Sequence, residues 1–507
     1  MKQSTLIKSI IPTALVAFTS CNQPEEKVTP PNIIYILADD MGYGDVKALN
    51  PQSKIPTPHL DRLVGEGMHF TDAHSNSAVC TPTRYGILTG RYCFRSRLKS
   101  GVLVGHEPSL IETGRTTIGS LLQNAGYYTG CVGKWHLGLD WAKKDSTLPL
   151  WHGGNLWDMF NTENVDYSAP VPGGPSDHGF DYSYIIPASL DIAPYVYVEN
   201  GQVTAPVTKH VPYFKDEKAR GIWYRHGDTA EDFDHTTVLQ NLTDKAISFI
   251  DQAAEKKQPF LLYFPLTSPH TPWFPSKGFN GISRAGVYGD FVAMTDAMAG
   301  RILESLDAHQ LAENTLIIFT SDNGSHWLKS DIETFKHRAN AHLVGMKSDV
   351  WEGGHRVPFI VRWPKVISAK SKSDEVICTT DLLATCAALT NQPLANSEGE
   401  DSYSMLPAFL GELTTKPLRE ATIHHSVNGT FAIRKGNWKY IDAKGSGGWS
   451  LPEGKVPKDA PDGQLYNMQT DPSEQSNLYD QHPEVVQELK TLLKKYKAQG
   501  FSRPMGQ

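Results

Sequence analysis

The chain has 507 residues, more than one hydrophobic core usually serves, so its length predicts one large domain and one smaller domain. Apolar residues make up 39 % and charged residues 20 %, which is typical of a globular protein. The net charge is −7 and no long basic run occurs, which argues against a nucleic-acid partner. An anionic substrate would therefore have to be bound by local positive charge and not by a basic surface.

The first 21 residues are predicted to be a targeting segment. A short positive region precedes an apolar run at Ile10–Phe18, which is too short to span a bilayer, and Cys21 follows it. This pattern resembles a bacterial lipoprotein signal with Cys21 as the lipidated residue. Phe18 stands where leucine is usual, which leaves plain secretion open. Residues 22–30 would be a tether, and the protein is expected to be exported to the periplasm or cell surface, with a lipid anchor as its only membrane contact.

Short apolar runs that end in polar residues recur along the chain. Four of them are expected to be buried strands: 32–38, 128–133, 260–264 and 316–320. Helical segments are expected between them: 58–68, 117–124, 237–253 and 290–308. This alternation predicts an α/β fold with a large mixed, mostly parallel sheet sandwiched by helices. Ligands bind beyond the carboxyl ends of such strands, so the polar residues there are expected to converge on one site.

The character of the sequence changes in two places. The stretch 141–227 is rich in glycine, proline and aromatic residues, which predicts an ordered substrate-binding insertion. Towards the C-terminus, short strands precede an amphipathic helix at 483–499. We therefore predict a catalytic domain over 31–415 and a smaller C-terminal α+β subdomain with an antiparallel sheet over 416–507.

The six cysteines are spaced like neither a zinc site nor a dense disulfide framework. Cys378 and Cys386 are close enough in sequence to form a local disulfide. Two buried free thiols are the alternative, and the sequence leaves this choice open.

The run Cys80-Thr-Pro-Thr-Arg-Tyr-Gly-Ile-Leu-Thr-Gly-Arg91 carries the most functional information in the chain. If it forms a helix, Pro82 lies in the first turn, where a missing N–H costs nothing. Residue 80 then lies at the helix N-terminus, where backbone N–H groups and the helix dipole favour an anion. Arg84 follows on the same helix face, where its guanidinium can contact whatever residue 80 attacks.

This run resembles the signature of the type I, formylglycine-dependent sulfatases, in which the cysteine of a Cys-x-Pro-x-Arg core is oxidised to formylglycine. The resemblance covers residues 31–507 and implies an alkaline phosphatase-like fold and hydrolysis of sulfuric esters. It also implies a separate formylglycine-generating maturation enzyme that modifies Cys80.

Two pairs of polar side chains follow predicted strands, Asp39-Asp40 and Asp322-Asn323. They offer four oxygen-bearing groups and no thiolate or imidazole, which favours Ca²⁺ or Mg²⁺ over zinc. In the family that the chain resembles, the matching residues hold one Ca²⁺ together with the formylglycine, which is Cys80 here, and the sulfate.

Four further residues take roles from the resemblance. Lys134 and Lys347 match sulfate-binding lysines, although Met346 stands where the family usually has glycine. His136 matches the residue that contacts the formylglycine hydrate. His270, in the sequence Ser-Pro-His-Thr-Pro, is placed to protonate the leaving alkoxide as a general acid, with His136 as the alternative acid.

Sugar specificity is indicated by the stretch Ser176-Asp-His-Gly-Phe-Asp-Tyr182, with Ala188-Ser-Leu-Asp191 and Pro194-Tyr195 after it. It looks similar to N-acetylgalactosamine- and galactose-6-sulfatases, which implies a 6-O-sulfated saccharide from glycosaminoglycan breakdown. Asp177 and His178 are then candidates for binding a sugar hydroxyl such as an axial O4. A turn cap and an exposed histidine are the alternative interpretation of these two residues.

Three other functions stay open. One is a sulfatase with a different carbohydrate or aryl sulfate as its substrate. Another is a phosphomonoesterase or phosphodiesterase of the same superfamily, although those enzymes generally use serine or threonine and two zinc ions. The last is a surface lipoprotein that binds sulfated glycans without catalysis, which an unmodified Cys80 would produce.

Overall fold

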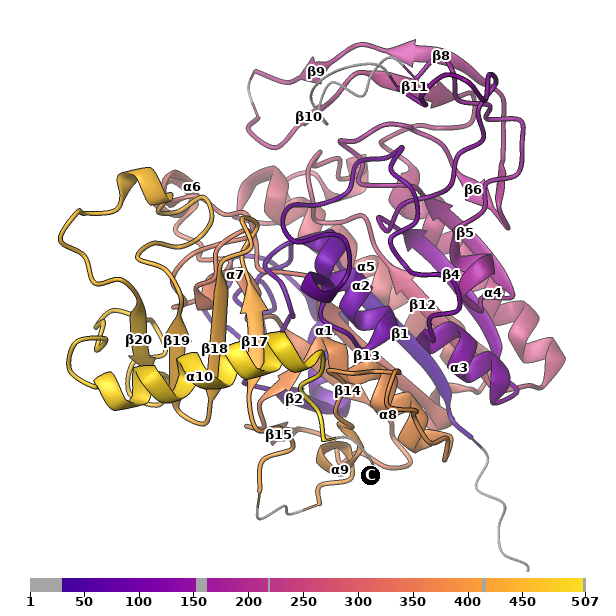
Figure 1. Ribbon diagram of the computed structural model, residues 1–507. Coiled ribbons are helices and arrows are strands. Elements are labelled where there is room, and N and C mark those ends of the chain that lie inside the picture. The colour runs from indigo at the N-terminus through magenta and orange to yellow at the C-terminus, as the bar shows by residue number, and fades with distance from the viewer. Residues whose placement is uncertain (1–29, 152–161, 218, 413–415, 505–507) are drawn as a thin grey trace, which may run out of the picture.

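The computed structural model of the protein describes residues 30–151, 162–217, 219–412 and 416–504. The predicted export signal, including Cys21, and the tether lie outside these residues. Figure 1 shows a large unit built around one sheet and a smaller, orange-to-yellow unit built around a second sheet. The predicted α/β class with a C-terminal antiparallel sheet is confirmed. The domain boundary after residue 415 stays a prediction.

In the described chain the large sheet has ten strands in the order β15-β2-β14-β13-β1-β12-β4-β5-β6-β7. Its five central strands are parallel: β1 (Asn32–Ala38), β4 (Tyr128–Lys134), β5 (Tyr182–Ile186), β12 (Phe260–Pro265) and β13 (Thr315–Ser321). The outer strands are β2 (Met68–Phe70), β6 (Val198–Glu199), β7 (Gln202–Val203), β14 (Phe359–Arg362) and β15 (Ser371–Ser373). The sheet is mixed because β14 is antiparallel to β13 and β6 is antiparallel to β5.

Strand β1 lies in the middle of this sheet, between β12 and β13. All of its side chains are buried, which explains why its sequence is a continuous apolar run and not an alternating one. The register pairs Ala38 with Ser321. The polar residues that follow β1 and β13 therefore leave the sheet side by side.

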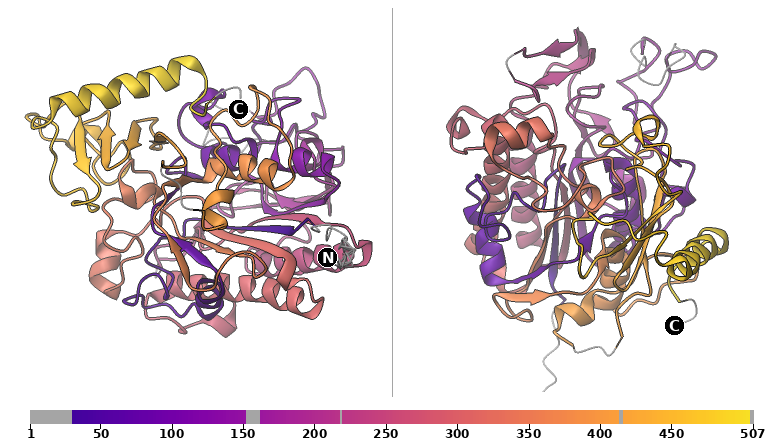
Figure 2. Two further views of the ribbon diagram at one scale, coloured as in Figure 1. Left: turned by 90° about the horizontal axis from the view of Figure 1, so that it is seen from below. Right: turned by 90° about the vertical axis from the view of Figure 1, so that its left-hand side faces the viewer.

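Helices cover both faces of the sheet (Figure 2). One group that packs together is α1 (Pro58–Glu66), α4 (Val238–Lys256) and α5 (Gly286–Ala308). A second group is α2 (Cys80–Thr89), α3 (Ile118–Asn124) and α8 (Leu382–Leu389). Shorter helices complete the large unit: α6 (Lys329–Phe335), α7 (Glu352–His355) and α9 (Leu406–Phe409). Between these two layers the apolar strands form one continuous core.

The stretch 141–227, predicted to be an insertion, also contributes β5 to the main sheet. The sequence analysis missed this strand, because five residues among many glycines and prolines give too short a pattern. Further along, small strands form two antiparallel ribbons at the top of Figure 1: β8 (Val207–Val211), β9 (Phe214–Lys215), β10 (Trp223–Tyr224) and β11 (Gly227–Ala230). A two-stranded parallel pair joins β3 (Ala73–His74) to β16 (Ile377–Cys378).

The smaller unit is a four-stranded antiparallel sheet covered by a helix. Its strands are β17 (Thr422–His425), β18 (Phe431–Lys435), β19 (Trp438–Ile441) and β20 (Gln464–Asn467). Helix α10 (Pro483–Gln499) has the predicted bounds. Its buried residues recur every three or four positions, which is the spacing of one helix face packed on a sheet: Val486, Leu489, Leu492, Leu493 and Tyr496.

The cysteines of the described chain are all free and buried: Cys80, Cys93, Cys131, Cys378 and Cys386. The open question about Cys378 and Cys386 is thereby answered in favour of two thiols. Within the described residues, no helix is long and apolar enough to cross a membrane.

A buried ion cluster joins the two units. The Lys439 ammonium on β19 lies 2.9 Å from Glu352 Oε1 at the start of α7 and 2.8 Å from Glu474 Oε1, and all three side chains are inaccessible to solvent. Burial and the Glu352 charge raise the pKa of Glu474 to about 7, although Lys439 lowers it. Lys439 therefore compensates charge from both units at once.

We predict that Lys439→Met lowers the free energy of unfolding by about 3–5 kcal/mol, because it leaves a buried carboxylate without its cation. Lys435→Met is the matched control, since Lys435 on the neighbouring strand pairs with Glu488 at the surface, where an ion pair contributes less than about 1 kcal/mol. Urea unfolding followed by tryptophan fluorescence measures both variants. Equal destabilisation by the two substitutions would contradict the role given to Lys439.

Candidate active site

Cys80 is the first residue of α2, as the sequence predicts, and Pro82 lies in the first turn of that helix. The Cys80 side chain lines a cavity and is only 2 % exposed. Burial raises the pKa of its thiol, but the ammonium groups of Lys134 and Lys347 outweigh burial and hold the pKa well below its ordinary value. The environment of residue 80 therefore stabilises negative charge.

The two predicted oxygen pairs meet at the carboxyl ends of β1 and β13. Asp39, Asp322 and Asn323 are inaccessible to solvent, and Asp40 is 5 % exposed. Asn323 donates its amide hydrogen to Asp40 Oδ1 at 2.7 Å, and the backbone N–H of Asp40 donates to Asp322 Oδ1 at 3.1 Å. Asp40 adopts a φ of 66°, which a non-glycine residue rarely does, so the chain turns sharply to bring both pairs together.

Each carboxylate of this cluster has its own buried cation. The Lys134 ammonium lies 2.7 Å from Asp39 Oδ2, and the Lys347 ammonium lies 2.7 Å from Asp40 Oδ1. The Arg84 guanidinium lies 2.7 Å from Asp322 Oδ2 through Nη2. Burial raises the pKa of Asp39, but the positive charges of these cations lower it by more. The pKa of Asp39 is therefore well below its usual range.

Arg84 makes contacts within the protein that the sequence analysis did not predict. The sequence placed its guanidinium against the group that residue 80 attacks, but in the structure Nε and Nη2 both donate to Asp322 and Nη1 donates to the Lys134 carbonyl at 2.8 Å. The helical spacing was right, but the buried carboxylate decides where the side chain points. Arg84 therefore holds Asp322 and the Lys134 carbonyl in place, and these contacts connect α2 to the carboxyl ends of β4 and β13.

The cluster fits a divalent cation. Asp39 Oδ1 and Asn323 Oδ1 are buried and accept no hydrogen bond from any described residue. Burial and the adjacent Asp39 carboxylate raise the pKa of Asp322 well above its ordinary value, which shows that the carboxylates repel each other. Ligand atoms of Asp39, Asp40, Cys80 and His270 lie within 4.8 Å of one another. The carboxylate and amide oxygens of Asp39, Asp40, Asp322 and Asn323 are the donors that hard divalent cations prefer.

Two histidines face residue 80 from different segments. His270 follows β12, and its Nδ1 donates to the Thr271 carbonyl at 2.6 Å, which leaves Nε2 3.7 Å from Asp40 Oδ2. Burial and Lys347 lower the pKa of His270, but Asp40 and Asp39 raise it to about 9, so its ring is protonated at neutral pH.

His136 differs from His270 in the protonation of its ring. Its Nε2 contacts the Leu103 carbonyl at 2.7 Å, while its Nδ1 is buried without a hydrogen-bond partner in the described chain. Burial and the Lys134 charge lower the pKa of His136, so its ring is neutral. The two histidines therefore differ in protonation, as an acid and a neutral partner would.

The cavity above these residues has a volume of about 330 Å³. Five of the predicted site residues line it: Asp40, Cys80, His136, His270 and Lys347. Four further predicted site residues lie deeper, with side chains that are inaccessible to solvent: Asp39, Arg84, Lys134 and Asp322.

Asp177 and His178 lie elsewhere. The Asp177 carboxylate accepts a hydrogen bond from the Gly173 N–H at 2.6 Å and lines a different cavity, as a turn-capping residue does. The His178 ring is buried and stacks on Trp135 at 6.2 Å between centroids. Neither side chain is among those that line the cavity at Cys80. The structure therefore favours the interpretation of Asp177 as a turn cap. His178, which that interpretation expected to be exposed, is buried.

Several residues to which the sequence analysis gave no role line the cavity instead: Ser189, Asp191, Trp223, Arg225, His326 and Trp449. The first four come from the aromatic-rich stretch 141–227, so its composition was the available signal. Trp449 belongs to the smaller unit, and no local pattern predicts that it reaches the site.

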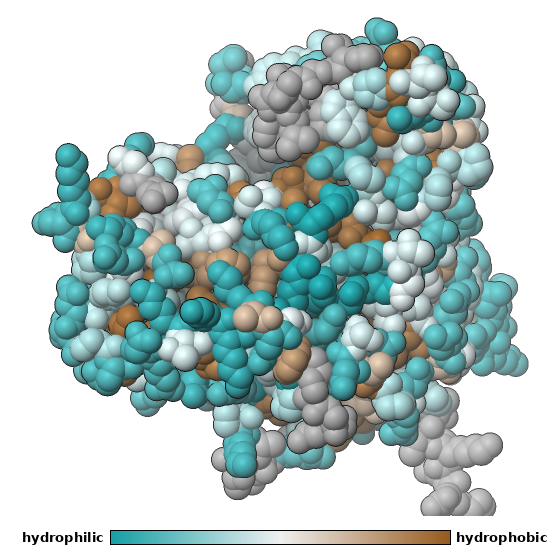
Figure 3. Space-filling view, in the orientation of Figure 1, coloured by the Kyte–Doolittle hydropathy of each residue, from teal (hydrophilic) through white to brown (hydrophobic). Residues whose placement is uncertain are grey.

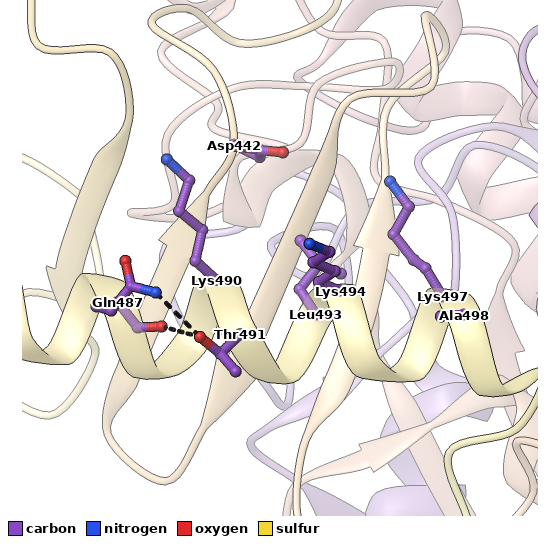
Figure 4. A pocket seen from close by; sticks show the side chains of 8 residues that line it. All are labelled: Asp442, Gln487, Lys490, Thr491, Leu493, Lys494, Lys497 and Ala498. Carbon is purple, nitrogen blue, oxygen red and sulfur yellow. Dashed lines mark hydrogen bonds between the residues drawn. The ribbon is translucent and has the colours of Figure 1, made fainter.

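A larger groove, of about 580 Å³, runs along α10 (Figure 4). Figure 4 shows three lysine side chains of this helix at the groove, Lys490, Lys494 and Lys497, with Asp442 beyond them. The residues lining this groove include no cysteine or histidine and a single carboxylate. The chemistry therefore assigns the active site to the smaller cavity at Cys80.

Comparisons with known proteins agree with this geometry. A family model described as Sulfatase matches residues 31–392. The chain is 35 % identical to the N-acetylgalactosamine-6-O-sulfatase of Bacteroides thetaiotaomicron, over 98 % of this chain and 100 % of that protein. It is 30 % identical to human N-acetylgalactosamine-6-sulfatase, over 77 % of this chain and 68 % of the human protein. A solved structure from work on the metabolism of multiple glycosaminoglycans by Bacteroides thetaiotaomicron matches with a TM-score of 0.79 and 34 % identity, covering 92 % of this chain and 99 % of its own.

Proposed function

The chain belongs to the sulfatase family and is a sulfuric ester hydrolase, and we propose that it removes 6-O-sulfate from N-acetylgalactosamine or galactose in sulfated glycans. The observation that carries the sugar assignment is the 35 % identity to an N-acetylgalactosamine-6-O-sulfatase over the full length of that enzyme. For the reaction type, support comes from the cavity, where residue 80 faces the Lys347 ammonium at 3.8 Å and a protonated His270.

We propose that Cys80 is oxidised to formylglycine by a separate maturation enzyme. When present, formylglycine supplies an oxygen nucleophile for the sulfur atom and a second hydroxyl from which sulfate is released, which a thiol does not. The start of α2 suits this group because the backbone N–H groups and the neighbouring ammonium groups stabilise negative charge at residue 80.

A single Ca²⁺ would be held by Asp39, Asp40, Asp322 and Asn323 together with residue 80. When bound, the ion supplies positive charge to the oxygens of the sulfate ester. The support for this assignment is the oxygen-only donor set of the four side chains and the two buried oxygens without hydrogen bonds.

The remaining residues bind and protonate the substrate. Lys347 lines the cavity and offsets charge on the sulfuryl oxygens, and Lys134 adds charge from beneath. Arg84 holds Asp322 and the Lys134 carbonyl in place. His270 carries a proton at neutral pH and donates it to the leaving alkoxide, while His136, which is neutral, orients residue 80.

We further propose that the protein is exported and anchored through a lipid on Cys21. This proposal depends on the charged, apolar and cysteine-containing pattern of the first 21 residues.

Conversion of Cys80 is tested by mass spectrometry of the peptide that contains it. We expect a mass lower by roughly 18 Da than that of the cysteine peptide, since the thiol is replaced by an aldehyde.

Cys80→Ala should lower sulfate release more than about 10³-fold, as loss of a nucleophile does. Cys93→Ala, at another buried free thiol, should retain activity. An unshifted peptide from active protein would contradict the proposal.

Calcium binding is tested by thermal unfolding of metal-free protein. Ca²⁺ at about one hundred times its Kd should stabilise the wild type by roughly 2.7 kcal/mol. Asp322→Asn should lose this stabilisation, and Asp331→Asn, at an ion pair with Arg220 outside the cavity, should keep it. If calcium stabilises both variants equally, the ion binds elsewhere.

Substrate choice is tested by sulfate release from 2-, 3-, 4- and 6-sulfated monosaccharides. We expect kcat/KM to be more than about tenfold higher for 6-sulfated N-acetylgalactosamine or galactose than for the other positions. Preference for another position would refute the sugar assignment and leave the sulfatase assignment intact. Release of phosphate from phosphate esters in preference to sulfate would refute both.

A further inference from the structure

Part of the cavity lining, called the wall below, consists of residues to which the proposed reaction gives no role. Asp191, Trp223 and Arg225 form part of this wall and line the same cavity as Cys80 and His270. A sulfate placed at Cys80 and Lys347 leaves the remaining space for the sugar that carries it. The wall residues are therefore positioned beside the sugar.

Arg225 is fixed on this wall by contacts with two other residues. Its Nη1 donates to Asp191 Oδ2 at 2.5 Å and to the Asp191 carbonyl at 3.1 Å, and its backbone N–H donates to the same carbonyl at 3.2 Å. The guanidinium carbon lies 5.0 Å from the centre of the Trp223 ring. The side chain remains 24 % exposed. Arg225 is thus an accessible donor group whose orientation is set before any substrate binds.

Asp191 serves Arg225 more directly than it serves the catalytic histidine. Its Oδ1 is 3.8 Å from His270 Nδ1, beyond hydrogen-bond distance, and His270 Nδ1 already donates to the Thr271 carbonyl at 2.6 Å. The Ser189 hydroxyl also donates to Asp191, whose carboxylate is 5 % exposed. Asp191 is therefore a buried clamp for the guanidinium.

We propose that Arg225, clamped by Asp191 and stacked on Trp223, is a specificity-determining residue that donates hydrogen bonds to hydroxyl oxygens of the sugar beside the sulfate ester. The Asp191 carboxylate neutralises the guanidinium, so the pair suits neutral hydroxyls better than a second anionic group. The proposal rests on the proposed function only in requiring that the substrate be a sulfated sugar.

The chain contains a matched control for Arg225. Arg220 stacks on Trp273 at 4.9 Å and pairs with Asp331 at 2.6 Å, so its contacts reproduce those of Arg225 with similar exposure, 30 %. The Arg220 side chain does not line the cavity and approaches it only through a hydrogen bond to the His326 carbonyl. Any general cost of removing a stacked, paired arginine should therefore be the same at both positions.

The test measures KM and kcat of the converted enzyme on the sulfated monosaccharide that the wild type hydrolyses best. Arg225→Met should raise KM about tenfold or more and leave kcat within about threefold, because it removes hydrogen bonds made by a charged donor to bound sugar. Arg225→Lys, which keeps the charge and loses the fork, should raise KM by a smaller factor and serves if the methionine variant folds poorly. Arg220→Met should change neither constant.

Binding without turnover supplies an independent readout. In a Cys80→Ala background, the Kd of the same sugar, measured by titration calorimetry, should rise with Arg225→Met and not with Arg220→Met. An unchanged KM and Kd would overturn the proposal, as would a loss of kcat at constant KM, which would make Arg225 a support for the catalytic groups. If the best substrate is not a 6-sulfated galactosamine or galactose, the proposed function is refuted. The comparison of Arg225→Met with Arg220→Met then still tests the role of Arg225, on the sulfated sugar that the enzyme does hydrolyse.

Discussion

The active site depends on the burial of three carboxylates at the ends of two adjacent parallel strands. Each ion transferred from water to the interior costs several kcal/mol unless a partner and hydrogen bonds compensate it, so Asp39, Asp40 and Asp322 require cations close by. Those cations come from three separate segments: Arg84 on α2, Lys134 at the end of β4, and Lys347 in a loop. Because Arg84 also belongs to the helix that begins at Cys80, charge compensation fixes the position of residue 80.

The same constraint joins the C-terminal sheet to the catalytic unit. Lys439 lies between Glu352 and Glu474 without solvent contact, and this cluster holds β19 against α7. Another contact between the two units is made by Trp449: its backbone N–H donates to the Ser348 hydroxyl at 3.0 Å, one residue from Lys347, and Trp449 lines the cavity. The division of the chain at residue 415 is therefore a division of sequence pattern, while the substrate cavity is built from both sides of it.

The predictability of the site follows from the range of the interactions that build it. Asp39, Asp40, Asp322 and Asn323 were predictable because strand patterns are local and parallel strands place their carboxyl ends together. Arg84 was placed on the correct helix face, but its direction depends on a carboxylate 238 positions away. Arg225 and Trp449 escaped prediction because irregular loops bring them to the cavity. The polar stretch at Asp177 gave a misleading signal, since local turn capping accounts for its carboxylate.

The pairing of charges in the cluster favours a divalent cation in this site. Each of the three carboxylates is paired with a cationic side chain at 2.7 Å, so these cations are already engaged within the cluster, and the chain as a whole carries a net charge of −7. Attraction must come from charge added to this balance. A divalent ion on the oxygens left without hydrogen bonds would add two positive charges at the cavity. A sulfate monoester carries a single negative charge, so this addition would give the cavity an excess of positive charge over the bound ester. That excess remains to stabilise the negative charge that develops on the leaving oxygen.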